Sequence, residues 1–156
     1  MSSGPKLVFH SSARRGYSSA VSAHPRHVGA RKLRREVQVR FADRPCTVQT
    51  QEGVVLARPG DAIITGIAGE NWRVSRSHFA EKYEAVPPTV DGQPGQYRSL
   101  PISILAVPMT EAFEVVLADE ASRLTGRPGD WLVDYGDGSL GIVSQPIFAT
   151  TYELTG

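Results

Sequence analysis

The sequence predicts a mainly β protein made of two tandem small antiparallel β modules, barrel-like or sandwich-like, with short helical turns and a basic N-terminal extension. Three observations lead to this prediction. The body of the chain repeats itself at a constant offset, which carries residue 58 onto residue 127. Short runs of apolar residues alternate with polar ones, which is typical of half-buried strands. Turn-forming residues separate these runs at short intervals.

The repeat is ungapped, and it relates residues 58–84 to residues 127–153 with 11 identities in 27 pairs. Both copies begin with Arg-Pro-Gly-Asp and end with Tyr-Glu. A fixed period of this length indicates a duplicated module whose copies share one fold. We therefore expect the two segments to superpose closely.

The composition is that of a globular chain. Of the 156 residues, 40% are hydrophobic and 21% are charged, and no apolar run approaches the roughly 18–20 residues that span a bilayer. Cys46 is the single cysteine, so neither an intrachain disulfide nor a zinc site with several cysteines of this chain is possible. A reducing, intracellular compartment is the default expectation.

Charge is distributed unevenly along the chain. Residues 1–35 contain eight Lys or Arg and no acid, whereas the remainder contains nine basic residues and all 16 acidic ones. A basic arm is thus joined to an acidic body.

We predict four segments. They are a basic extended arm (1–35), β module 1 (36–86), a Pro/Gly linker (87–100) and β module 2 (101–156). In module 1, the alternation of Val37, Val39 and Phe41 with polar residues predicts a first strand, and further strands are expected over 46–50 and 54–57.

The repeated turn follows these strands. Pro59 restricts φ and Gly60 accepts a positive φ, which suits the central positions of a type II turn. An apolar strand from residue 63, a hairpin at 68–71 and a short helical turn at 76–82 complete module 1. Module 2 repeats this order of elements, with strands from residue 102 and over 113–117 and a hairpin at 135–139.

The residues of the repeat resemble a recurrent β module, the PGDYG-type family. The matching pieces are Pro59-Gly60-Asp61 with Phe79 and Tyr83-Glu84 in the first copy, and Pro128-Gly129-Asp130 with Phe148 and Tyr152-Glu153 in the second. Ala62 and Trp131 depart from the pattern, because they stand where the family usually has Tyr. The resemblance implies a fold and no particular activity, so function has to be argued from a site.

Asp61 and Asp130 are the candidate acidic residues. As a pair they could form a two-carboxylate site between the modules. An acid directly after a Pro-Gly turn more often accepts hydrogen bonds from nearby backbone N–H groups, and we favour that structural role.

No cofactor or metal site is predicted. Residues 136–141 match the pattern G-x-G-x-x-G, but a strand and not a helix is expected after them, so the segment is interpreted as a β-hairpin. His24 and His27 have a suitable spacing for a metal, but no cysteine or acid lies near them.

The basic arm is the feature with the clearest functional content. Six of its residues are candidate anchors for RNA or an acidic partner: Arg14, Arg15, Arg31, Lys32, Arg34 and Arg35. Basic segments bind polyanions through counterion release. Three alternatives remain open: the arm folds on its own acidic body, it is a solubilising tail, or it is a mitochondrial presequence with a processing site at 15–18.

These observations favour a non-enzymatic structural or interaction protein, an accessory subunit of a larger protein or ribonucleoprotein assembly, anchored by its arm. The alternative is a small-ligand-binding protein or enzyme that uses the cleft between the modules, with Asp61 and Asp130 as polar groups. The expected location is intracellular: the mitochondrial matrix if the arm is a targeting signal, and the cytoplasm otherwise.

Overall fold

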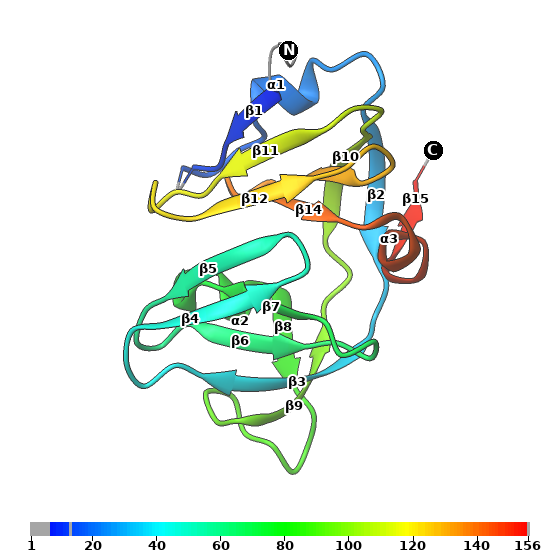
Figure 1. The fold of residues 1–156 in the computed structure, drawn as a ribbon. Coiled ribbons are helices and arrows are strands. Elements are labelled where there is room, and N and C mark those ends of the chain that lie inside the picture. Colours follow the sequence, from blue (N-terminus) through cyan, green and yellow to red (C-terminus); the bar gives the residue numbers. More distant parts are fainter. Residues whose placement is uncertain (1–6, 13, 156) are drawn as a thin grey trace. The chain divides into compact units, whose positions relative to one another are not determined.

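The computed structural model describes residues 7–12 and 14–155 (Figure 1). Residues 1–6 and 13 of the predicted arm lie outside this description. The mainly β prediction is confirmed, with 46% strand, 12% helix and open, sandwich-like sheets in place of a closed barrel. No helix in the described part of the chain is long and apolar enough to cross a membrane. Contacts divide the chain into unit 1 (1–31 and 103–156) and unit 2 (32–102).

Unit 2 has a five-stranded antiparallel sheet in the order β7-β6-β3-β9-β8, and a separate hairpin of β4 and β5. Its elements are β3 (Glu36–Phe41), β4 (Cys46–Thr50), β5 (Gly53–Ala57), β6 (Ala62–Thr65), β7 (Asn71–Val74), α2 (Arg76–Lys82), β8 (Tyr83–Ala85) and β9 (Gly95–Ser99). The strands predicted at 46–50 and 54–57 and the helical turn predicted at 76–82 are therefore present.

Unit 1 has a five-stranded sheet in the order β14-β13-β10-β2-β15, and a smaller sheet in the order β1-β11-β12. Its elements are β1 (Leu7–His10), α1 (Ser19–Ser22), β2 (Val28–Lys32), β10 (Ser103–Pro108), β11 (Phe113–Val116), β12 (Arg123–Gly126), β13 (Trp131–Asp134), β14 (Leu140–Val143), α3 (Gln145–Thr151) and β15 (Tyr152–Leu154). Lys32, the last residue of β2, already belongs to unit 2.

The two units share one topology. The elements from β6 to β8 and those from β13 to β15 begin and end at positions that the offset of the sequence repeat carries onto one another. The pairing register is also shared, because β6 pairs with β7 as β13 pairs with β14. The duplicated module therefore folds twice in the same way.

In each five-stranded sheet, four strands belong to one copy of the repeat and the fifth belongs to the other copy. The fifth strand is β2 in unit 1 and β9 in unit 2. β2 pairs with β10 in unit 1, and β9 pairs with β3 in unit 2. In the sequence, β2 directly precedes β3 and β9 directly precedes β10. The repeat thus begins at residues 28 and 95, inside the predicted arm and linker, and its two copies exchange their first strands.

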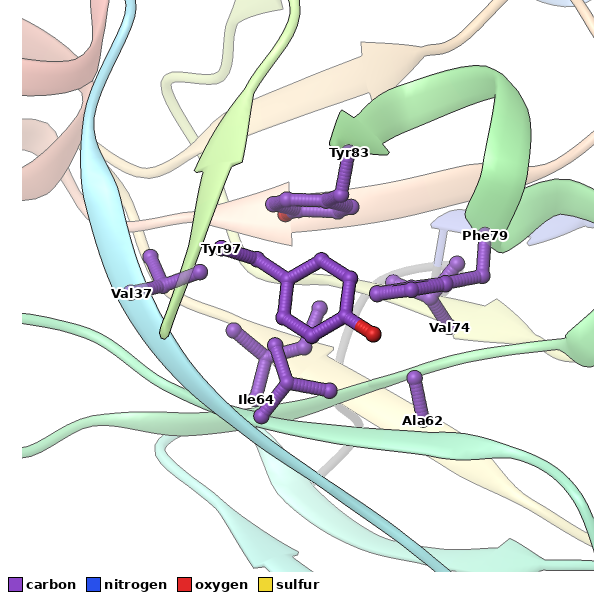
Figure 2. Close-up of a cluster of buried hydrophobic side chains, with 8 residues drawn as sticks. Val37, Ala62, Ile64, Val74, Phe79, Tyr83 and Tyr97 are labelled. Atoms are coloured by element: carbon purple, nitrogen blue, oxygen red, sulfur yellow. The ribbon is translucent and has the colours of Figure 1, made fainter. Parts of the chain in front are cut away.

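The strands and α2 of unit 2 bury apolar side chains in a common core (Figure 2). Val37 and Val39 alternate with exposed residues on β3 and are buried, as predicted. The ring of Phe79 on α2 stacks on the Tyr83 ring, with 5.3 Å between centroids, and Tyr97 of β9 packs edge-on against Phe79. Burying each such side chain contributes about 1.5–3 kcal/mol, so strand β9 is integral to this core.

Candidate interaction surfaces

Asp61 and Asp130 form the same hydrogen bonds in the Pro-Gly-Asp turns of their own units. In each, the carboxylate Oδ2 accepts a hydrogen bond from the backbone N–H of the arginine that begins the turn, at 2.9 Å from Arg58 and 3.0 Å from Arg127. The aspartate N–H donates back to the carbonyl of the same arginine, at 3.0 Å in both turns. The intervening glycines have φ of +92° and +98°, as a type II turn requires.

Asp61 also makes contacts beyond its own turn. Its buried Oδ1 accepts a 3.3 Å hydrogen bond from the N–H of Arg76, the first residue of α2. Arg73 of β7 places Nη1 4.0 Å from Asp61 Oδ2. Asp61 therefore joins the turn to the helix and to the neighbouring strand, in keeping with a structural role.

Two of the six predicted arm anchors form ion pairs within their own units. Arg31 of β2 contacts Glu153 with Nε and Nη2, at 3.0 Å for Nε. Arg34 Nη1 lies 3.8 Å from Glu84 Oε1, which also contacts Arg98 Nε at 3.2 Å. Because β2 and β9 are equivalent, Arg31–Glu153 and Arg98–Glu84 are the same ion pair in the two copies. Such exposed pairs contribute about 0–1 kcal/mol.

Lys32, a third predicted anchor, is buried in unit 2. Its side chain donates a hydrogen bond from Nζ to the Tyr83 hydroxyl oxygen at 2.8 Å. Nζ also lies 4.7 Å from the centre of the Tyr83 ring and 5.9 Å from that of Trp72. The indole N–H of Trp72 donates to the same hydroxyl oxygen at 3.3 Å. Lys32 thus belongs to a buried aromatic cluster of unit 2.

The charge asymmetry of the sequence nearly disappears within the units. Residues 1–31 and 103–156 contain seven basic and eight acidic residues, and residues 32–102 contain ten and eight. The net charges of the two units are therefore −1 and +2. The predicted anchors Arg14, Arg15 and Arg35 are exposed, and Arg35 Nη1 donates to the Arg34 carbonyl oxygen at 3.2 Å.

The N-terminal segment (residues 7–12 and 14–18) lies on a defined surface of unit 1. We call this the unit 1 docking surface: the outer edge of β11 and the β13–β14 hairpin, residues 135–139. β1 pairs in parallel with β11 (Figure 1), and the Ser11 N–H donates to the Val116 carbonyl oxygen at 2.8 Å. This arm segment is therefore part of the folded unit.

The hairpin binds the rest of the segment through the backbone. Ser12 N–H donates to the Gly138 carbonyl oxygen at 2.8 Å, and Gly16 N–H donates to that of Gly136 at 3.1 Å. In return, the N–H of Leu140 donates to Ser11 Oγ at 3.0 Å. The G-x-G-x-x-G match is thus a β-hairpin, as predicted, and its glycines leave room for a chain that lies against it.

Sequence reasoning missed Asp134, the residue that fixes the end of this segment. Its fully buried carboxylate accepts hydrogen bonds from Ser18 N–H at 2.5 Å and Gly136 N–H at 3.0 Å. Burial raises the pKa of Asp134 and the nearby Asp137 charge adds to the rise, while the two backbone donors lower it. The available signal was an acid at the end of a predicted strand, where the first copy has Thr65.

No described segment of the chain pairs with the equivalent surface of unit 2. We call it the unit 2 docking surface: the outer edge of β4 and the β6–β7 hairpin, residues 66–70. Within the described part of the chain, β4 pairs only with β5. The tips of the β4–β5 and β6–β7 hairpins surround a shallow pocket of about 220 Å³. It is lined by Gln49, Thr50, Gln51, Ala68, Gly69, Glu70 and Asn71.

The fold and its two Pro-Gly-Asp turns define a duplicated β protein with exchanged first strands. The chain belongs to the PGDYG family, since the family model described as PGDYG protein matches residues 53–153. The matched range contains both turns, and in this chain the aspartate of each turn binds its own backbone. No curated protein and no solved structure matches the chain.

Proposed function

We propose that this protein is a non-enzymatic interaction protein, an accessory subunit of a larger assembly, and that it contacts a protein partner through the unit 2 docking surface. One observation carries the proposal. The two units share a fold, and in unit 1 the docking surface is covered by the chain's own N-terminal segment, while no described segment covers its equivalent in unit 2.

Exposed apolar side chains on unit 2 support a protein partner. Ile67, in the β6–β7 hairpin beside the pocket, is 81% exposed. On β5, Val54 and Leu56 are also exposed, and Val54 pairs with Gln49 of the pocket lining. Exposed apolar residues that gather beside a strand edge are typical of interaction surfaces.

A second candidate function concerns anions. Arg14 and Arg15 are exposed on a segment whose backbone is held by the unit 1 hairpin, so their side chains are presented from a fixed position. We propose them as the anchor of the arm for RNA or an acidic partner. Lys32 is less suited to this role, because its side chain is buried and donates to the Tyr83 hydroxyl oxygen.

The alternative of a ligand-binding protein or enzyme depends on Asp61 and Asp130. Both carboxylates already accept backbone hydrogen bonds in their turns. These contacts support a structural role, and we do not propose a catalytic one.

The location that we propose is a reducing intracellular compartment, the cytoplasm. The matrix-processing site expected at 15–18 falls within the segment that is hydrogen-bonded to unit 1. Cleavage there would detach β1, the strand that pairs with β11, from the rest of the chain. Mass spectrometry of the protein isolated from its source cells tests this: a chain that begins near residue 16 would instead support a mitochondrial presequence.

Affinity capture from the source cells tests the interaction function. The full-length chain is compared with Ile67→Ser and with Leu154→Ser, which removes a 59% exposed apolar side chain from unit 1. We expect a stoichiometric assembly with the wild type and Leu154→Ser, and its loss with Ile67→Ser. Equal recovery with all three chains would contradict a role for the unit 2 docking surface.

A further inference from the structure

We infer that the unit 2 docking surface binds an extended, basic segment of a partner protein, which adds to β4 as a parallel strand. This inference rests on the proposed interaction function and names the chemistry of the partner. It is argued from the equivalence of the two units, since unit 1 displays a bound segment on the corresponding surface.

The bound segment in unit 1 provides the geometry. β1 pairs in parallel with β11, with Leu7 opposite Phe113 and His10 opposite Val116. The chain continues in the same direction, and Ser11 N–H donates to the Val116 carbonyl oxygen at 2.8 Å. This carbonyl therefore points to the outer edge of β11, away from β12.

The same edge exists on β4. Val116 pairs with Arg123 across the unit 1 hairpin, and Gln49 pairs with Val54 across the unit 2 hairpin. The offset of the repeat carries Val54 onto Arg123, so Gln49 is the residue equivalent to Val116. Its carbonyl is predicted to face the outer edge of β4, where no described strand pairs. An unpaired strand edge is a template for an added strand.

The hairpin next to this edge has room for a chain. Gly69 and Gly138 are equivalent and have similar φ, +78° and +94°. A Cβ on Gly138 would lie 1.7 Å from the Arg14 carbonyl oxygen, which belongs to the bound segment. A Cβ on Gly69 would have no described atom within 4 Å. The space that the segment fills on unit 1 thus holds no described atom at the equivalent glycine of unit 2.

The side chains around the edge indicate what the partner carries. Glu70 is the charged residue of the pocket lining and stands where unit 1 has Ser139. In unit 1, the backbone of Arg14 in the bound segment lies against the equivalent hairpin. A partner segment with Lys or Arg at this point would complement Glu70.

The start of β4 also differs from its counterpart. In unit 1, Phe9 of the bound segment packs edge-on against Phe113, with 6.3 Å between centroids. By register, Cys46 is the equivalent of Phe113, because they pair with Ala57 and Gly126, respectively. The smaller Cys46 leaves space for a large apolar side chain of the partner.

A peptide with a known bound form tests the inference. The probe is a synthetic peptide with the sequence of residues 7–17, blocked at both ends and titrated into the isotopically labelled full-length protein. We expect saturable shifts and slowed exchange of backbone amides in β4 and in residues 66–70, with those of β11 unchanged. No response of β4 up to millimolar peptide would overturn the inference, and so would a response confined to β11.

Gly69→Asn provides the matched variant. Asparagine accepts positive φ better than other residues with a Cβ, and its side chain would occupy the place of the added chain. We expect at least a tenfold loss of peptide affinity, whereas unchanged affinity would overturn the inference. If the peptide fails while Ile67→Ser still abolishes capture of the assembly, strand addition is wrong and the interaction function stands.

Discussion

Gly69 and Gly138 occupy equivalent hairpin positions with similar backbone conformations and opposite surroundings. Gly138 lies against the backbone of Arg14, while no described atom lies within 4 Å of the Cβ position of Gly69. In unit 1, the chain's own N-terminal segment thus lies on the hairpin, whereas in the described part of the chain no segment lies on the equivalent hairpin of unit 2. A residue with a Cβ is strained by the positive φ at both positions, but it displaces the segment only at Gly138. Comparing the same substitution at the two glycines therefore measures the contribution of the segment.

Gly138→Asn is expected to destabilise the protein far more than Gly69→Asn. In Gly138→Asn, the new Cβ displaces the segment, and four hydrogen bonds are lost: those donated by the N–H groups of Ser11, Ser12 and Gly16, and the one that Ser11 Oγ accepts. At about 1 kcal/mol for each bond, the loss is about 4 kcal/mol. The strain at positive φ is common to both variants. Urea unfolding followed by circular dichroism measures both, and similar midpoints would show that the segment contributes little to stability.

Replacing Asp61 is expected to lower the free energy of unfolding more than replacing Asp130. Asp61→Ala removes acceptors for both Arg58 N–H and Arg76 N–H and takes away the carboxylate beside Arg73, whereas Asp130→Ala removes the acceptor for Arg127 N–H. We expect losses of about 2–4 kcal/mol for Asp61→Ala and about 1 kcal/mol for Asp130→Ala. Thermal unfolding of both variants measures this. An Asp61→Ala protein of wild-type stability would reopen a functional role for this carboxylate.

The buried pair of Lys32 and Tyr83 is expected to be energetically coupled. Tyr83→Phe removes the hydroxyl that accepts from Lys32 Nζ and should cost about 1–3 kcal/mol. Combining it with Lys32→Met removes both polar partners, so the double variant should be more stable than the sum of the single losses predicts. A double-mutant cycle of unfolding free energies checks this, and strict additivity would mean that the two groups do not interact.

Asp134 should make the stability depend on pH in a defined direction. Its pKa is raised in the folded protein above the ordinary value of 3.8, chiefly because the carboxylate is desolvated by burial. The folded state therefore binds this proton more tightly than the unfolded state does. The resulting stabilisation is complete below pH 3.8 and is lost as the pH rises through the raised folded pKa.

The variant Asp134→Asn isolates this effect. Since asparagine does not titrate, the unfolding free energy of the wild type minus that of the variant should fall as the pH rises from 3.8 through the raised pKa. Urea unfolding of both proteins at several pH values provides the difference. A difference that instead grows with pH would mean that the backbone donors, Ser18 and Gly136, dominate over desolvation.

Local patterns predict the parts of the fold that local residues determine. The alternation in β3, the Pro-Gly-Asp turns and the helix at 76–82 follow from strand periodicity, from φ restrictions and from the repeat itself. Strand residues after 136–141 predict a hairpin there, and β13 and β14 form it.

The exchanged strands could not be predicted in this way. β2, with the sequence Val-Gly-Ala-Arg-Lys, has no clear alternation, and β9 follows several prolines and glycines that resemble a linker. Both are strands because a distant strand pairs with them, and such pairing depends on tertiary context more than on local propensity.

The same limit applies to the candidate sites. The charge of the arm is plain in the sequence, but its neutralisation depends on contacts between residues far apart in the chain, such as Arg31 and Glu153. Gly69 and Gly138 are matched residues of the repeat, and only the structure reveals that one of them is covered. The difference between the two docking surfaces is the segment that lies on one of them. The sequence of either repeat copy alone therefore contains no pattern that predicts this difference.

Arg14 and Arg15 are expected to dominate any binding of polyanions. The double variant Arg14→Glu/Arg15→Glu should weaken binding to poly-uridylate and reduce the salt dependence, since each lost phosphate contact lowers the slope of log K against log salt by about 0.7 on single strands. The matched control is Arg40→Glu/Arg44→Glu, which reverses two exposed charges outside the arm. Fluorescence anisotropy titrations at several salt concentrations measure both. If the two double variants lose affinity equally, binding follows net charge and the arm is not an anchor.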